Sequence, residues 1–226
     1  ISPLADDGIV ASMSAEQQAL YGRGSYIVNG PGLCNECHTP GGRNLDRTVK
    51  TAQFLSGGQA FAVPPPLQPL LKQVRTVSGD LTGDNGFTLP FSMFLQTLVS
   101  GASFTGSVPH ALGFPMPFDV FRNMTVADKQ AVYTYITTIQ ASGLVTGEPD
   151  HQAPARYCET ATAATDCPGA GEACTAVTIL GTPTHECTGT ACTSDADCGA
   201  CQACDIGNTN KCLAEDPASA CVTTSF

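Results

Sequence analysis

The sequence is short of charge, and above all of basic charge. Only 13% of its 226 residues are Asp, Glu, Lys or Arg, against about 25% in an average domain. Ten basic residues face 20 acidic ones, and the net charge of −10 argues against a nucleic-acid-binding protein, which needs a basic face for the phosphates. Apolar runs also stay well below the roughly 18 residues of a membrane-spanning helix, so we expect no membrane span.

Cysteine is scarce in the first 157 residues, where only Cys34 and Cys37 occur, and dense after them. The other ten of the 12 cysteines fall between Cys158 and Cys221. This local density is typical of a disulfide-stapled module in an exported chain. The number of possible pairings is too large for any one to be predicted from the sequence.

The chain also divides by charge at about residue 150. Residues 1–150 carry 8 basic and 11 acidic residues, net −3, whereas residues 151–226 carry 2 and 9, net −7. The stretch between them, residues 142–154, is rich in Gly and Pro and has no sustained period, as expected of a linker. We therefore predict two domains, 1–150 and 151–226.

The periodicity of the first domain predicts helices. Three are expected: from a capping box at 14–17 to the Asn29-Gly30 stop, across 91–99 before Gly101, and from a second box at 125–128 to about Gln140. A short helix is also expected at 67–74. Because no segment alternates convincingly with a period of two, we predict a mainly α protein: a helical domain followed by a small, irregular, disulfide-rich module.

The motif Cys34-Asn35-Glu36-Cys37-His38 has the C-x-x-C-H spacing of covalent c-type haem (heme c) attachment. Two thiols at this spacing reach the two vinyl groups of one porphyrin, and the following histidine then lies under the iron as an axial ligand. A redox C-x-x-C pair or half of a zinc site are the alternatives. No βαβ context or second ligand pair in this domain favours either of them.

The sixth iron position needs a second ligand, for which Met116 is our candidate. It lies in Gly113-Phe-Pro-Met-Pro-Phe118, where two prolines stiffen the backbone and two phenylalanines supply apolar cover. His110 is the main alternative and Met124 a weaker one. Met93, between two phenylalanines, suits the core, and Met13 precedes a predicted helix.

Several short stretches of the first domain match a known pattern. They are GRGSYIVNG at 22–30, CNECHTP at 34–40, FLSGG at 54–58, DLT at 80–82, FPMPF at 114–118, NMT at 123–125 and YI at 135–136. By their order and spacing over residues 17–140, the chain resembles a class I cytochrome c. It is most similar to the cytochrome c domains in subunits of membrane-bound alcohol and aldehyde dehydrogenases, which usually have Asn where Asp80 stands.

The resemblance implies the roles of the motif residues. Cys34 and Cys37 would be the thioether links, His38 the proximal ligand and Met116 the distal ligand of one haem. It also implies that the N-terminal helix, with Gly22 and Tyr26, crosses the C-terminal helix near Tyr135. Four basic residues are candidates to neutralise the haem propionates: Arg43, Arg47, Lys72 and Arg75.

These features predict an exported monohaem electron carrier in the periplasm or outside the cell, and not an enzyme acting alone. Alternatives are an electron-accepting subunit of a dehydrogenase or oxidase complex, with a redox protein partner, and an extracellular assembly that relays electrons between copies. An iron–sulfur site at Cys198, Cys201, Cys204 and Cys212 is a further alternative, less favoured than disulfides. We expect the cysteine-rich module to serve docking or self-assembly, and its removal to leave the haem spectrum unchanged.

Overall fold

The computed structural model describes residues 2–82, 89–103, 110–145, 155–163, 167, 172–179, 182–189, 202–204 and 212–214. The chain divides into two compact units, each made of segments that are distant in the sequence. The first unit comprises Ile1–Gln59, Ser78–Thr105 and Pro117–Asp150, and the second comprises Ala60–Val77, Gly106–Met116 and His151–Phe226. A break at residue 150 was expected. The two segments of the first half that join the second unit were not.

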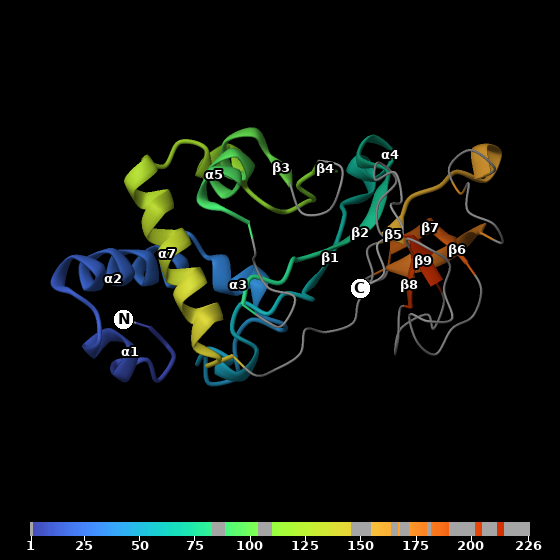
Figure 1. Ribbon diagram of the computed structural model, residues 1–226. Helices are drawn as coiled ribbons and strands as arrows, with labels where there is room; N and C mark the ends of the chain where they lie inside the picture. Colours follow the sequence, from blue (N-terminus) through green and yellow to red (C-terminus); the bar gives the residue numbers. More distant parts are fainter. Residues whose placement is uncertain are drawn as a thin grey trace. The chain divides into compact units, whose positions relative to one another are not determined.

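The first unit is built from helices, with α2 and α7 at its centre (Figure 1). Its elements are α1 (Asp7–Ala11), α2 (Ala15–Asn29), α3 (Cys34–His38), the 3-10 turn η1 (Thr51–Gln53), α5 (Phe91–Ser100), β3 (Ala102–Ser103), α6 (Phe118–Phe121) and α7 (Val126–Ser142).

The ends of the three predicted helices are confirmed. Ser14 and Gln17 form the capping box of α2, and Thr125 accepts a hydrogen bond from the Asp128 N–H at the start of α7. Helix α5 ends at Gly101, whose φ of +73° glycine adopts at little cost.

Helices α2 and α7 cross in direct contact at Gly24. A Cβ atom on Gly24 would lie 2.1 Å from the Ala131 carbonyl oxygen and 2.7 Å from Cβ of Tyr135. One turn away, the rings of Tyr21 and Tyr135 pack with centroids 4.9 Å apart. The predicted crossing near Tyr135 is therefore confirmed, but the contact residues were wrong.

Gly22 and Tyr26 face away from the crossing. A Cβ atom on Gly22 would meet nothing within 4 Å, and Tyr26 is 65% exposed. The 3.6-residue period explains the error, because residues two positions from Gly24 lie on a different side of the helix.

A buried polar network lies beside this crossing. The Tyr21 hydroxyl donates to Asp6 Oδ2 at 2.5 Å, while the Tyr135 hydroxyl bonds Ser2 Oγ at 2.9 Å and accepts from Asn29 Nδ2 at 3.3 Å. Burial raises the pKa of both tyrosines, and the bond to Asp6 raises that of Tyr21 further. The N-terminal segment is thus tied to the two central helices.

The second unit is built from short strands. Its elements are β1 (Ala60–Ala62), η2 (Pro65–Leu67), α4 (Gln68–Leu71), β2 (Gln73–Val77), β4 (His110–Ala111), β5 (Ala155–Arg156), η3 (Thr160–Thr162), β6 (Ala173–Ile179), β7 (Thr182–Thr188), β8 (Gln202–Cys204) and β9 (Cys212–Ala214). Strand β2 lies at the centre of an antiparallel sheet of order β1-β2-β5.

Strand β2 corrects the prediction of a helix over 67–74. The helix stops at Leu71, because Lys72 adopts a left-handed φ of +54°, and the chain continues as a strand. Pairing of β2 with β5 also explains why residues 60–77 belong with the second half of the chain.

Strands β6 and β7 pair along their whole length, so this part of the module predicted to be irregular is a regular hairpin. One face of β7 carries Thr184, Glu186 and Thr188, which are buried but polar, and Cys187 on the other face is buried as well. A strand whose buried face is polar lacks the apolar alternation that predicts a strand from the sequence. Strands β8 and β9 also pair, with Cys204 opposite Cys212.

Within the described ranges, no helix combines the length and the apolar character that crossing a bilayer requires.

Candidate functional site

Cys34, Cys37 and His38 lie together on the short helix α3 of the first unit. Leu33, with a left-handed φ of +51°, begins this helix, and the chain becomes extended again at Thr39. Residues three and four apart lie on one helix face, so the two thiols and the imidazole share a side of α3. Neither thiol is in a disulfide.

The His38 ring is held by a backbone carbonyl. Its Nδ1 lies 2.8 Å from the Gly79 carbonyl oxygen. Since a carbonyl only accepts hydrogen bonds, Nδ1 carries the proton, and Nε2 keeps the lone pair that binds a metal. A second bond, from the Gly57 N–H to the His38 carbonyl at 2.7 Å, fixes the backbone of the same residue. This arrangement orients a histidine as a metal ligand.

Only glycine fits at position 57, where the chain passes close to the backbone of Gly79 and Asp80. Its φ is +77°, and a Cβ atom there would lie 2.6 Å from the Gly79 carbonyl carbon and 2.5 Å from the Asp80 nitrogen. Asp80 in turn accepts a bond from the Thr82 N–H at 2.9 Å. The stretches 54–58 and 80–82, noted in the sequence, thus flank His38.

Sequence reasoning missed both supports of His38. Every residue has a backbone carbonyl, so the residue type at position 79 does not reveal that this carbonyl binds His38. The sequence did hint at Gly57, because it lies in the FLSGG stretch at 54–58. Its positive φ is a conformation that other residues disfavour.

Burial sets the protonation of the three motif residues. Burial raises the pKa of the Cys34 thiol to about 12. The pKa of Cys37 is raised by burial and then by the Glu36 charge, and the pKa of His38 is lowered by burial. At neutral pH the helix therefore presents two thiols and a neutral imidazole.

This donor set fits a covalently attached haem. The two unpaired thiols share a helix face, and the imidazole has its second nitrogen fixed by a carbonyl. Among the residues that the structure describes, no second pair of cysteines or histidines joins them to complete a zinc site.

Met116 belongs to the second unit, whereas the three motif residues belong to the first. It ends the 106–116 segment of the second unit, is half-buried, and donates its N–H to the Gly113 carbonyl at 3.1 Å. Its pairing with His38 on one iron stays a prediction.

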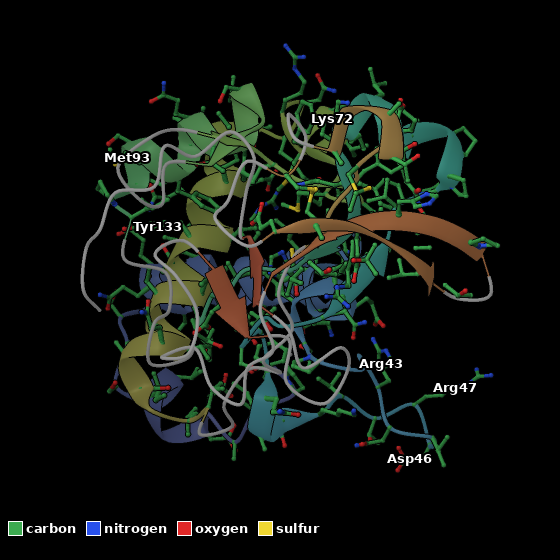
Figure 2. All side chains as sticks on the ribbon, turned by 90° about the vertical axis from the view of Figure 1, so that its right-hand side faces the viewer. Arg43, Asp46, Arg47, Lys72, Met93 and Tyr133 are labelled. Atoms are coloured by element: carbon green, nitrogen blue, oxygen red, sulfur yellow. A yellow bond between two sulfur atoms is a disulfide. The ribbon has the colours of Figure 1, made fainter. Side chains whose placement is uncertain are left out.

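The other candidate sixth ligands are distributed as follows. Met93 is 40% exposed on α5 and not in the core as expected (Figure 2). Tyr133 packs on Phe91 and Phe94 of the same helix. Met13 and Met124 directly precede the N-caps of α2 and α7. The side chain of His110 lies outside the described part of the chain.

Two of the four candidate propionate partners lie on the loop after α3. Arg43 Nη2 lies 2.5 Å from Glu36 Oε1, and its Nη1 donates to the Arg47 carbonyl at 3.0 Å. Figure 2 shows Arg43, Asp46 and Arg47 on this exposed loop. Lys72 and Arg75 belong to the second unit.

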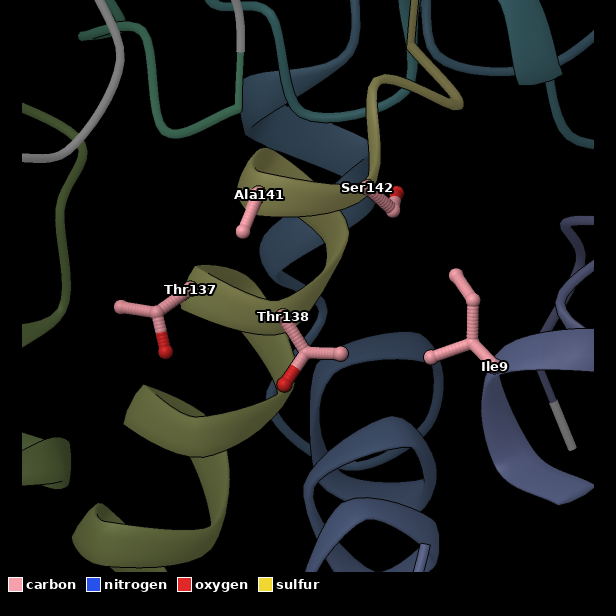
Figure 3. A pocket seen from close by; sticks show the side chains of 5 residues that line it. All are labelled: Ile9, Thr137, Thr138, Ala141 and Ser142. Carbon is pink, nitrogen blue, oxygen red and sulfur yellow. The ribbon is translucent and has the colours of Figure 1, made fainter. Parts of the chain in front are cut away.

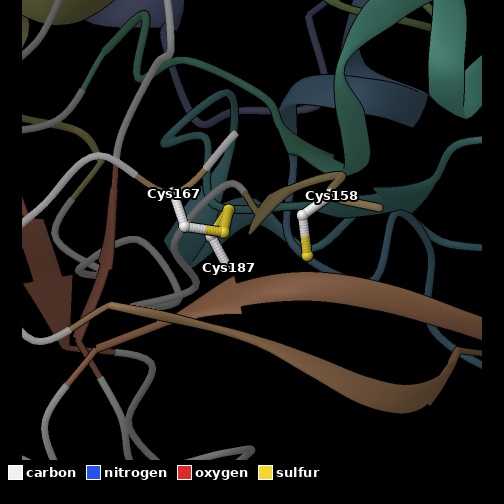
Figure 4. Close-up of side chains that lie close together, drawn as sticks. All are labelled: Cys158, Cys167 and Cys187. Atoms are coloured by element: carbon white, nitrogen blue, oxygen red, sulfur yellow. A yellow bond between two sulfur atoms is a disulfide. The ribbon is translucent and has the colours of Figure 1, made fainter. Parts of the chain in front are cut away.

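The sulfur atoms of the second unit do not offer a metal site. Those of Cys158, Cys167 and Cys187 lie within 4.8 Å of one another (Figure 4), the one such group of potential metal ligands among the described residues. All three are in disulfides, Cys158–Cys174 and Cys167–Cys187, and a bonded sulfur is not a thiolate ligand. Disulfides in the module are thus confirmed for these pairs.

The alternative iron–sulfur cysteines fall mostly outside what the structure describes. Cys198 and Cys201 lie there entirely, and only the backbone of Cys204 and Cys212 is described.

A shallow pocket between α1 and the end of α7 is unrelated to the motif. Figure 3 shows its lining: Ile9, Thr137, Thr138, Ala141 and Ser142. None of these side chains titrates near neutral pH or is a common metal ligand, so the pocket supplies no candidate chemistry.

Comparison with known proteins gives one partial match. No protein-family model matches the chain, and no solved structure matches it. Over 59 residues the chain is 44% identical to the cytochrome c subunit of a quinone alcohol dehydrogenase from Gluconobacter oxydans (strain 621H). Part of this chain is related to a cytochrome c subunit. The match covers 26% of this chain and only 11% of that subunit, so most of both proteins lies outside it.

Proposed function

We propose that this chain is an exported monohaem c-type cytochrome of class I fold that transfers single electrons. The observation that carries the proposal is helix α3, on which two free thiols share a face with an imidazole whose Nδ1 is held by the Gly79 carbonyl. The partial identity to a cytochrome c subunit supports the same conclusion.

Each residue has a distinct role in this proposal. Cys34 and Cys37 would form the thioether links, and His38 Nε2 and the Met116 thioether would be the two protein ligands of the iron. A haem bound in this way supplies an iron that changes charge by one electron. Gly79 keeps the imidazole in the tautomer that binds metal, and Gly57 holds the backbone of His38.

Two protein ligands favour electron transfer over catalysis. With His38 and Met116 both engaged, no position is left for a substrate. Methionine opposite histidine also raises the reduction potential relative to two histidines. The disulfides of the second unit are typical of an oxidising compartment, which supports a periplasmic or extracellular location.

A second candidate function is that of an electron-accepting subunit of a dehydrogenase complex. The name of the Gluconobacter relative favours it, since that protein is a subunit of an alcohol dehydrogenase. Isolation of the native chain from its source distinguishes the two functions. Stoichiometric co-purification of a catalytic subunit supports the complex, and a chain that elutes alone supports the free carrier.

Spectroscopy of the purified holoprotein tests the proposal. We expect a low-spin c-type spectrum with the methionine–iron charge-transfer band, no response of the reduced form to carbon monoxide, and one covalently bound haem per chain by mass. A high-spin spectrum with ready carbon monoxide binding would contradict closed His38/Met116 ligation.

Matched variants assign the ligands. Met116→Leu should abolish the charge-transfer band and open the reduced iron to carbon monoxide, whereas Met93→Leu, at an exposed methionine, should change neither. The double variant Cys34→Ser/Cys37→Ser should release its haem into acidified acetone. Retention of haem by that variant would contradict thioether attachment.

A further inference from the structure

Met116 ends a tight turn. Its N–H donates to the Gly113 carbonyl at 3.1 Å, which closes a four-residue turn across Phe114 and Pro115. The proline ring fixes one of the backbone angles within the turn. With the turn closed, the position of Met116 depends on what holds the turn as a whole.

Thr76 of strand β2 contacts the turn through both branches of its side chain. Its Oγ1 donates a hydrogen bond to the Phe114 carbonyl. Its Cγ2 lies 3.1 Å from the point where a Cβ of Gly113 would stand, so the Gly113 backbone packs directly on the methyl group. The hydroxyl and the methyl therefore restrain two successive residues.

Thr76 is itself firmly placed. It is 4% exposed and lies opposite Phe61 in the register of β1 and β2. Strand β2 has a paired strand on both sides, so it cannot shift with the turn without breaking its ladders. The neighbouring Val74 is fully buried and anchors the same strand.

We propose that Thr76 is the positioning residue that keeps the Met116 thioether available to the iron. The inference rests on the proposed function, in which Met116 is the distal ligand. A thioether is neutral, so no charge holds it on the metal, and its occupancy depends on how well the chain presents it. The Thr76 hydroxyl holds the turn in place, because it ties the carbonyl two residues before Met116 to a strand that is paired on both sides.

Three variants of the holoprotein separate the hydroxyl from simple packing. Thr76→Val removes the hydroxyl and keeps the volume, and Thr76→Ser keeps the hydroxyl. Thr178→Val makes the same change at an exposed threonine of β6 in the same unit. Far-UV circular dichroism verifies that each variant is folded.

Two measurements report how often the Met116 turn opens. Loss of one hydrogen bond shifts an opening equilibrium by about tenfold, so we expect carbon monoxide to bind reduced Thr76→Val about ten times faster than wild type. Amide hydrogen exchange at Met116, whose N–H donates to the Gly113 carbonyl, reports the opening of the turn directly and should also be about ten times faster. Thr76→Ser and Thr178→Val should match wild type in both measurements.

The outcomes are distinct. Equal rates in Thr76→Val and wild type overturn the proposal, and so does faster exchange without faster carbon monoxide binding. Equal effects of Thr76→Val and Thr76→Ser overturn the role of the hydroxyl.

A second variant serves if Thr76→Val does not fold. Gly113→Ala pushes a Cβ against the Thr76 methyl and should raise the carbon monoxide rate, while an unchanged rate overturns the proposal. If Met116→Leu leaves the spectrum unchanged, the proposed function fails. The exchange rates then still report whether Thr76 holds the turn.

Discussion

The crossing of α2 and α7 makes a sharp prediction at Gly24, because the two helices are closest there. Alanine is the better helix former by about 1 kcal/mol, and in isolation Gly24→Ala would stabilise α2. In the structure the added Cβ would lie 2.1 Å from the Ala131 carbonyl oxygen, about 1.3 Å short of ordinary contact at 3.4 Å. The obstacle is helix backbone, which has no rotamer with which to move aside.

The helices must separate to admit the methyl group. Separation loosens the packing of Tyr21 on Tyr135 at the same crossing. Overpacking of this kind destabilises a protein by about 3 kcal/mol, whereas the higher helix propensity of alanine stabilises it by about 1 kcal/mol. We therefore expect Gly24→Ala to lower the free energy of unfolding by about 2 kcal/mol.

Gly22→Ala is the matched control on the same helix. Nothing lies within 4 Å of its added Cβ, so it should gain stability by about 0.8 kcal/mol. Denaturant unfolding followed by circular dichroism gives the stability of both variants, compared at equal m-values, the dependence of the unfolding free energy on denaturant. Equal unfolding midpoints for Gly24→Ala and Gly22→Ala would refute the crossing contact.

Three further predictions follow from the described contacts. Gly57→Ala should displace the Gly79 carbonyl from His38, so we expect a broadened or high-spin haem spectrum. Gly22→Ala should leave the haem spectrum unchanged. Because burial and Asp6 raise the pKa of Tyr21, the unfolded chain loses this proton first. Stability should therefore be complete below about pH 10 and fall above it, less steeply in Tyr21→Phe, as melting temperatures from pH 9 to 11 would record. Replacing both cysteines of the Cys167–Cys187 disulfide by serine should cost about 3 kcal/mol, measurable as faster proteolysis of the second unit.

The helical part of the fold was predictable because its signals are local. A capping serine and glutamine, a glycine after an apolar period and a threonine cap each act within one turn, and α2, α5 and α7 begin or end where these residues stand. The strands were not predictable in this way. Strand β2 finds a partner some 80 residues away in β5, and the buried face of β7 carries polar groups.

The candidate site shows the same limit. C-x-x-C-H identifies the three side chains of α3 because their chemistry requires that spacing. The groups that orient His38 are backbone atoms of Gly57 and Gly79, brought in from 19 and 41 residues further along the chain. Residue types do not encode such contacts, which depend on the path of the whole chain.

The second unit changes what is expected of the cysteine-rich half. If that half were a separate appendage, its removal would leave the haem spectrum unchanged. In the structure it supports β2, the strand that carries Thr76: β5 pairs with β2, and the Tyr157 N–H donates to the Lys72 carbonyl at 3.1 Å. Thr184 also donates to Gln68 Oε1 at 2.5 Å.

A chain that ends at residue 150 loses all of these contacts, and β2 becomes an edge strand that pairs with β1 alone. We now expect such a chain to bind carbon monoxide in its reduced form more readily than the full chain, because the Met116 turn rests on that strand. The disulfide-intact full chain is the reference, measured at the same haem content. Identical carbon monoxide kinetics in the two proteins would mean that the first half holds Met116 without help. The cysteine-rich half would then have to be explained by docking or assembly alone.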